Sequence, residues 1–93
     1  MFYEYLQNYL TIFTMRKILV IGSGKSSSYL IKYFLNEAKT EKLYVTIGDI
    51  NIEHAELLIK NNPNARAIKL DVFNDKARAE AIINSDIVVS MLP

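Results

Sequence analysis

The sequence predicts an α/β fold in which a parallel β-sheet is covered by helices on both of its faces. Two observations predict it. From residue 17 onward, short apolar runs alternate with longer segments in which apolar residues recur at helical spacing, and this alternation is typical of successive βαβ units. The first apolar run is also followed directly by a glycine-rich turn that opens a helix. A doubly wound sheet with right-handed crossovers is therefore expected.

The first half of this pattern contains two strands and one helix. Residues 18–21 form a continuous apolar run, as expected of a strand that is buried on both faces. After the turn at residues 22–24, residues 25–38 are expected to form a helix, and residues 43–48 a second strand. The helix places these apolar residues on one face: Leu30, Ile31, Phe34, Leu35 and Ala38.

The second half repeats the same alternation. Asn51 is expected to cap a second helix that ends at residues 62–64, and residues 67–72 are expected to form a third strand. Asn74 is expected to cap a third helix, which leads into a fourth strand at residues 86–92. The apolar residues expected to face inward are Ile52, Ala55, Leu58 and Ile59 in the second helix, and Ala79, Ile82 and Ile83 in the third.

Four strands and three helices make an incomplete Rossmann-like fold, because the complete fold has about six strands. Residues 15–93 are therefore expected to be a partial dinucleotide-binding domain, in which the fourth strand lies beside the first and an open sheet edge remains. Residues 1–14 are expected to be an amino-terminal extension that forms a short amphipathic helix. A helix that covers one sheet edge is the alternative for this segment. We expect the whole to be a fragment of a longer protein.

Composition excludes several classes of function. With 11 basic against 10 acidic residues, the chain has no charge surplus for binding nucleic acid or an anionic membrane surface. No cysteine is present, which excludes disulfides and thiolate zinc sites and favours a reducing compartment. The apolar segment at residues 1–14 is shorter than the roughly 20 residues that a membrane span requires. A cytoplasmic location is expected. We expect no metal site, because a single histidine, His54, cannot form a metal cluster by itself. His54 is also expected to be exposed and without function.

The strongest local signal is the glycine-rich turn after the first strand, Gly22-Ser23-Gly24-Lys25-Ser26-Ser27. Its first glycine permits a tight turn, and its second lets the backbone approach a pyrophosphate that lies on the helix N-terminus. Ser27 stands where a third glycine is usual, and it is small enough to keep the helix close to the strand. A plain turn without a ligand is the alternative.

The sequence Gly24-Lys25-Ser26 resembles the end of a nucleotide-triphosphate-binding P-loop. The spacing is wrong, because the position of that motif's first glycine is occupied by Leu19 inside the strand. Lys25 is therefore expected to be a solvated residue near the phosphates.

Two acidic residues end the next two strands. Asp49 ends the second strand, where an acid accepts hydrogen bonds from the adenosine ribose. A carboxylate there would repel a 2′-phosphate, so NAD is expected in preference to NADP. Asp71 and Val72 end the third strand at the same rim, where we expect the adenine. The alternatives are that Asp49 is only a turn residue before Asn51, and Asp71 a turn residue before the next cap.

The order of four sequence motifs along the chain is more specific for a protein family than any one motif alone. They are Ile-Leu-Val-Ile-Gly-Ser-Gly-Lys-Ser-Ser-Ser-Tyr-Leu, Gly-Asp-Ile-Asn, Ala-Ile-Lys-Leu-Asp-Val-Phe-Asn-Asp and Ser-Asp-Ile-Val-Val-Ser-Met-Leu-Pro. Over residues 15–93 this order resembles the amino-terminal, NAD(P)-binding part of the saccharopine dehydrogenase family. The resemblance implies a nicotinamide-dependent oxidoreductase of lysine metabolism, which interconverts saccharopine with glutamate and aminoadipate semialdehyde by hydride transfer at a C–N bond.

The resemblance also implies a role for each matching position. The pyrophosphate would be held by Gly22, Ser23, Gly24, Ser26 and Ser27, the adenosine ribose by Asp49 and Ile50, the adenine by Asp71 and Val72, and the nicotinamide side by Leu92 and Pro93. Residues 48–51 lack the basic residue of NADP-using members, which favours NAD and the lysine-degrading branch. In this family the amino-acid substrate binds to a later domain. No catalytic residue is therefore expected before Pro93, the fragment alone is expected to be inactive, and a homodimer of the full-length protein stays open.

Two other classes of protein share these features. A non-catalytic NAD-binding regulatory module has the same strand, turn and acid, and it would lack a substrate domain. A methyltransferase that binds S-adenosylmethionine has a similar turn and acid, but its ligand has no pyrophosphate.

Overall fold

The computed structural model describes residues 15–91, with the backbone alone for Lys25 and Ser26. Strands and helices alternate along this range in the order β1 (Arg16–Ile21), α2 (Lys25–Glu37), β2 (Leu43–Asp49), α3 (Ile52–Ile59), β3 (Ala65–Lys69), α4 (Asp75–Ile83) and β4 (Ile87–Ser90). The extension expected at residues 1–14 and the cofactor-binding positions Leu92 and Pro93 lie outside the described residues. The alternation predicted from residue 17 onward is confirmed.

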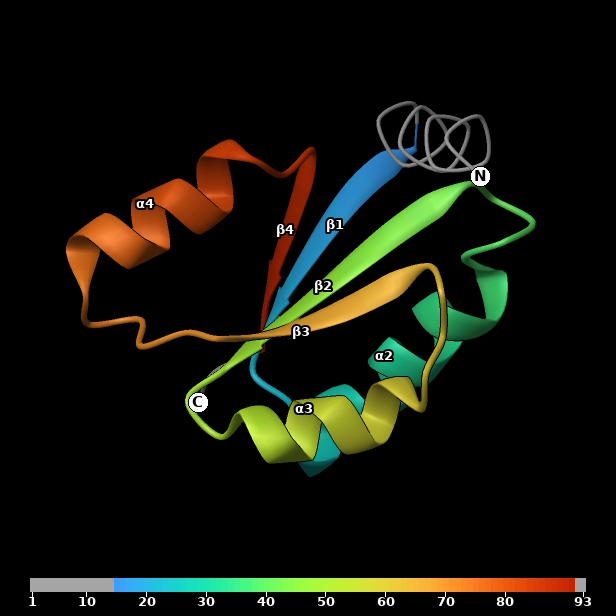
Figure 1. The fold of residues 1–93 in the computed structure, drawn as a ribbon, viewed down its shortest axis with the longest axis horizontal. Coiled ribbons are helices and arrows are strands. Elements are labelled where there is room, and N and C mark those ends of the chain that lie inside the picture. The colour runs from blue at the N-terminus through green and yellow to red at the C-terminus, as the bar shows by residue number, and fades with distance from the viewer. Residues whose placement is uncertain (1–14, 92–93) are drawn as a thin grey trace, which may run out of the picture.

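The four strands form one parallel sheet in the order β3-β2-β1-β4. The fourth strand lies beside the first, as predicted, with Ile18 opposite Val45 on one side and Ile87 on the other. Figure 1 shows α2 and α3 on one face of the sheet and α4 on the opposite face. The doubly wound α/β arrangement is therefore confirmed. Within residues 15–91, no helix is long and apolar enough to cross a membrane.

The apolar run of β1 is buried on both faces of the sheet. Ile18 and Val20 pack among the residues of α2, α3 and β2, whereas Leu19 and Ile21 pack with Leu70 on the side of α4. Successive side chains of a strand point to opposite faces, so a continuous apolar run is what a central strand between two helical layers requires.

Both predicted asparagine caps are present. The side chain of Asn51 accepts a hydrogen bond from the backbone of His54, with 3.3 Å between the nitrogen and the oxygen. That of Asn74 accepts one from the backbone of Ala77 over 3.1 Å. Each cap satisfies a backbone donor that the first turn of a helix would otherwise leave unpaired.

Several boundaries differ from the predicted ones. The third strand covers Ala65–Lys69, because its ladder with β2 runs from Val45 opposite Ala65 to Asp49 opposite Lys69. The second helix ends at Ile59 because the next two residues have left-handed backbone. The fourth strand covers Ile87–Ser90, where its ladder with β1 ends.

The inward face predicted for α4 is wrong. Ala79 is exposed, and 41% of Ile82 and 82% of Ile83 is exposed. Ala77 and Ala81 face the sheet instead and pack against the second apolar cluster. Arg78 connects α4 to the preceding loop, because its guanidinium donates a hydrogen bond to the carbonyl of Val72 over 2.6 Å.

Candidate functional site

A crevice opens where the carboxyl ends of β1, β2 and β3 meet, next to the point at which the strand order reverses. Ligands of open α/β sheets bind at such a position. The cavity there has a volume of about 230 Å³ and is lined by Ile21, Gly22, Gly48, Asp49, Ile50, Leu70, Asp71, Val72 and Phe73. Sequence reasoning had selected five of these residues from three separate segments, namely Gly22, Asp49, Ile50, Asp71 and Val72. The structure brings them together.

The backbone conformation requires glycine at one of the two glycine positions of the turn, Gly22, and does not require it at the other, Gly24. Gly22 has a φ of 99°, a backbone conformation that side-chain-bearing residues rarely adopt. Its N–H donates to the carbonyl of Gly48 over 2.9 Å, so the turn is fastened to β2. Gly24 has an ordinary φ of −68°, and a Cβ atom built on it would meet no atom within 4 Å. Neither conformation nor packing requires glycine at position 24, and the open space there fits the close approach of a phosphate group.

The amino-terminal turn of α2 faces this space. The first N–H groups of a helix have no carbonyl partner within the helix, and with the helix dipole they favour an anion. Lys25 and Ser26 provide backbone of that turn. Ser27 is buried, and its hydroxyl donates to the carbonyl of Gly24 over 3.0 Å. Ser27 therefore closes the turn and keeps the helix near the strand.

The carboxylate of Asp49 is bound to the glycine-rich turn. Its Oδ2 accepts hydrogen bonds from the backbone N–H of Ser23 over 2.7 Å and from the Ser23 hydroxyl over 2.5 Å. Its Oδ1 accepts one from the backbone N–H of Asn51 over 2.8 Å. A carboxylate has about four acceptor positions, so the protein itself uses three of them. Asp49 lies where the sequence predicted it, with at most one acceptor position left for a ribose hydroxyl.

These bonds hold Asp49 in its charged form. Burial alone would raise the pKa of Asp49, but the hydrogen bonds from Ser23 and Asn51, and the charge of His54, lower it further than burial raises it. The net result is a pKa below the ordinary value of 3.8.

His54 completes this arrangement, although sequence reasoning assigned it no role. Its Nδ1 lies 3.0 Å from the hydroxyl oxygen of Ser23, and the side chain is half-buried, not exposed as expected. The one available sequence signal is its place in the first turn of α3, three residues after the cap Asn51, which directs the side chain back toward the preceding strand end.

Asp71 lines the crevice and also stabilises the turn that follows β3. Its Oδ1 accepts a hydrogen bond from the backbone of Phe73 over 3.0 Å, and its carbonyl accepts one from the backbone of Asn74 over 3.0 Å. The neighbouring side chains make the crevice apolar: Ile50 is 60% exposed and Phe73 is 89% exposed. Phe73, which the sequence reasoning missed, adds an aromatic wall beside Val72 that is suited to a flat base.

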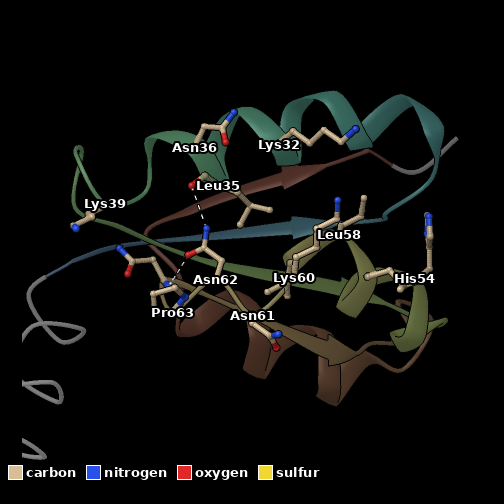
Figure 2. Close-up of a pocket in the computed structure, with 13 residues that line it drawn as sticks. Lys32, Leu35, Asn36, Lys39, His54, Leu58, Lys60, Asn61, Asn62 and Pro63 are labelled. Atoms are coloured by element: carbon tan, nitrogen blue, oxygen red, sulfur yellow. Dashed lines mark hydrogen bonds between the residues drawn. The ribbon is translucent and has the colours of Figure 1, made fainter.

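A larger hollow of about 930 Å³ lies elsewhere, between α2 and α3. Figure 2 shows Lys32 and Asn36 on α2 and Asn61 and Asn62 in the loop after α3, with Asn62 donating to the carbonyl of Leu35. The hollow contains none of the predicted cofactor-binding residues, although His54, whose ring contacts Ser23, also lines it. Within the described part of the chain, no group of three or more His, Cys, Asp or Glu residues is arranged to hold a metal ion.

Comparison with known proteins decides the family. Residues 18–93 match the family model described as the saccharopine dehydrogenase NADP binding domain. The chain belongs to this family. The resemblance to saccharopine dehydrogenases and the Rossmann-like fold that it implied are both confirmed.

Two relatives extend the match. Over 79 residues, 85% of this chain, it is 29% identical to the saccharopine dehydrogenase [NADP(+), L-glutamate-forming] of Schizosaccharomyces pombe. Over 102 aligned positions, covering 98% of this chain, it is 29% identical to the mitochondrial alpha-aminoadipic semialdehyde synthase of Mus musculus. The chain spans 17% and 10% of the lengths of these two relatives.

The comparisons show a domain of the nicotinamide-dinucleotide-binding kind, and they favour NADP over NAD. The preference for NAD was based on Asp49 repelling a 2′-phosphate and on the lack of a basic residue within residues 48–51. In the structure the Asp49 carboxylate is hydrogen-bonded to Ser23 and Asn51. The contacts of individual residues with the cofactor stay predictions.

Proposed function

We propose that the protein to which this chain belongs is an NADP-dependent oxidoreductase that acts on saccharopine, and that the described domain holds the adenosine diphosphate part of the cofactor. The family match and the printed name of the fission yeast relative support this proposal. When bound, NADP would supply the hydride acceptor for the substrate carbon that bears the secondary amine. No catalytic residue is assigned within residues 15–91.

In this proposal the chain's residues bind and orient the cofactor. The backbone of Gly22, Gly24 and the first turn of α2 binds the pyrophosphate. The ribose lies beside Asp49 and Ile50, and the adenine enters the crevice against Val72 and Phe73. Leu92 and Pro93 are proposed for the nicotinamide side from the family resemblance alone.

NADP is proposed in preference to NAD. In NAD-binding sites of this fold, an acid at the end of the second strand binds the ribose 2′-hydroxyl. Asp49 occupies that position, but three of its acceptor positions are taken by Ser23 and Asn51. The carboxylate therefore does not need the ribose 2′-hydroxyl as a further hydrogen-bond donor, and this weakens the argument for NAD.

The observation that supports the function most directly is the open space at Gly24, at the entrance of a helix beside the apolar crevice. The test is a steady-state assay of the complete protein with saccharopine, following NADPH formation. We expect a higher kcat/KM with NADP than with NAD. A Gly24→Val variant is expected to lose activity, and Ile83→Ala, on the exposed face of α4, is the control.

Failure of the complete protein to oxidise saccharopine, while it still binds NADPH, would restrict the proposal to cofactor binding. It would then favour the regulatory-module alternative. A cytoplasmic location and a homodimer stay predictions.

A further inference from the structure

The hydroxyl of Ser23 lies between an acid and a base. It is 2.5 Å from Oδ2 of Asp49 and 3.0 Å from Nδ1 of His54, and Ser23 is completely buried. The three residues come from the ends of β1 and β2 and from the first turn of α3. The cofactor-binding roles proposed above use Asp49 and the turn, but they leave His54 without a role.

The direction of these hydrogen bonds follows from the number of protons. A serine hydroxyl has one proton to donate and can also accept. Because an ionised carboxylate can only accept, the Ser23 proton goes to Asp49. His54 must then donate from Nδ1 to the Ser23 oxygen. The result is a series of two hydrogen bonds in which His54 donates to Ser23 and Ser23 donates to Asp49.

These hydrogen bonds fix where the negative charge of Asp49 points. Oδ2 receives two hydrogen bonds from Ser23 and Oδ1 receives one from the backbone of Asn51, so the carboxylate is held against the glycine-rich turn. A carboxylate free to rotate outward would stand against a 2′-phosphate and repel it. A carboxylate held inward leaves room for that phosphate.

We propose that His54 is a positioning residue that selects NADP over NAD. By donating to Ser23, it holds the Ser23 hydroxyl on the Asp49 carboxylate and keeps that carboxylate away from the adenosine 2′-position. The inference rests on the proposed function, since it concerns which dinucleotide the same crevice accepts.

His54 contributes little else to the fold. The helix α3 is anchored in the core by Ala55 and Ile59, which are buried, and its cap bond uses the backbone of His54, not the ring. A side-chain substitution at position 54 therefore changes the hydrogen-bond chain and leaves the cap and the core contacts in place.

The test measures the dissociation constants of the complete protein for NADPH and NADH by nicotinamide fluorescence. For His54→Leu, which cannot donate, we expect the preference for NADPH over NADH to fall at least about tenfold. His54→Asn places an amide donor at about the position of Nδ1 and is expected to restore most of the preference. Leu57→Ala, on the exposed side of the same helix, is the control and is expected to keep it.

A second readout needs no cofactor. The carboxyl ¹³C resonance of Asp49, followed by NMR during an acid titration, is expected to give a higher pKa in His54→Leu than in the parent chain. If His54→Leu does not fold, the same two measurements are made on His54→Met, which also has no N–H donor.

The outcomes are distinct. If the chain binds both dinucleotides and the ratio of their affinities is unchanged in the folded His54 variants, the proposal is overturned while the proposed function stands. If the complete parent protein binds neither NADPH nor NADH, the proposed function fails, and the selection role of His54 fails with it. A lowered ratio in His54→Leu that His54→Asn restores supports the proposal.

Discussion

The hydroxyl of Ser23 donates a hydrogen bond to Oδ2 of Asp49 over 2.5 Å, and the backbone N–H of the same serine donates to the same oxygen over 2.7 Å. The two residues are 26 positions apart in the chain and close the ends of neighbouring strands. This pair connects the phosphate-binding turn to the acid beside the ribose position. The shape of one half of the crevice therefore depends on the charge state of Asp49.

The first prediction concerns acid stability. Because the folded-state pKa of Asp49 lies below its ordinary value of 3.8, the folded protein binds this proton more weakly than the unfolded chain does. The stability that Asp49 contributes is thus fully present above about pH 4 and is lost as the pH falls through the folded-state pKa. The free energy of unfolding, measured with urea at several pH values between about 2 and 6 and at constant salt concentration, is expected to show this loss.

Ser23→Ala isolates the same contribution. It removes one hydrogen bond to a charged group, so the free energy of unfolding at neutral pH is expected to fall by about 1.5–3 kcal/mol, and its dependence on acid is expected to be weaker. The matched control is Ser85→Ala, whose hydroxyl donates to the backbone carbonyl of Ala81. Equal acid dependence in the Ser23 variant and the parent would show that Ser23 does not stabilise the charged Asp49.

The second prediction separates two glycines. A Cβ atom at Gly48 would lie 2.9 Å from Cδ2 and 3.2 Å from Cβ of Leu70, so Gly48→Ala is expected to destabilise the fold by about 1–3 kcal/mol. Gly24→Ala meets open space and is expected to cost less than about 1 kcal/mol. The Gly24 variant should nevertheless bind NADPH at least about tenfold more weakly, because its methyl group occupies the phosphate position.

Thermal unfolding and NADPH titration of both variants test this pair. A Gly24→Ala variant that binds NADPH as tightly as the parent would contradict the placement of the pyrophosphate.

The third prediction concerns the loop that forms the apolar wall. Arg78 donates to the carbonyl of Val72 over 2.6 Å and pairs with Asp75 over 2.9 Å. The pair with Asp75 is on the surface and contributes about 1 kcal/mol or less. Arg78→Ala removes the hydrogen bond that connects α4 to the loop at Val72. The affinity for NADPH is therefore expected to fall several-fold, as measured by fluorescence titration.

Arg66→Ala is the matched control for Arg78→Ala. Arg66 bonds the hydroxyl of Thr46 over 3.2 Å, and it does not line the crevice. Equal losses of affinity in the two arginine variants would indicate a general charge effect and contradict a specific role of the loop.

The fourth prediction concerns local stability. No residue of α4 is buried, whereas α3 buries Ala55 and Ile59. Helices with few buried contacts open locally at lower free energy, so amide exchange in α4 is expected to be at least about tenfold faster than in the middle of α3. Hydrogen–deuterium exchange measured by NMR tests this, and equal protection of the two helices would mean that α4 is held by more than Ala77 and Ala81.

The order of elements could be predicted from the sequence because each boundary has a local cause. Asn51 and Asn74 cap helices through bonds that span only three residues, and Gly22 marks a turn that requires positive φ. The rotation of α4 was predicted wrongly because its apolar residues, Ala77, Ala79 and Ala81 to Ile83, point in several directions around the helix. The contacts of α4, among them the hydrogen bond from Arg78 to Val72, depend on the path of the preceding loop.

The position of the candidate site could be predicted from the sequence, but the orientation and hydrogen bonding of Asp49 could not. Asp49 was placed at the correct strand end from spacing alone. Its orientation depends on a backbone donor and a hydroxyl of Ser23, and on a histidine 31 residues from that serine. Such contacts follow from tertiary structure, so spacing alone could not predict them. The preference for NAD relied on the position of the acid and on the absence of a basic residue in residues 48–51, whereas the family match favours NADP.

The most direct test of the central claim is a ¹⁵N NMR titration of the full chain with NADPH. If the dinucleotide binds across the carboxyl ends of β1, β2 and β3, the largest amide shifts are expected at Gly22, Gly24, Asp49, Ile50 and Val72. Residues of the hollow between α2 and α3, such as Asn36 and Asn61, are expected to stay unchanged. Shifts confined to that hollow, or no shifts at saturating NADPH, would contradict the account.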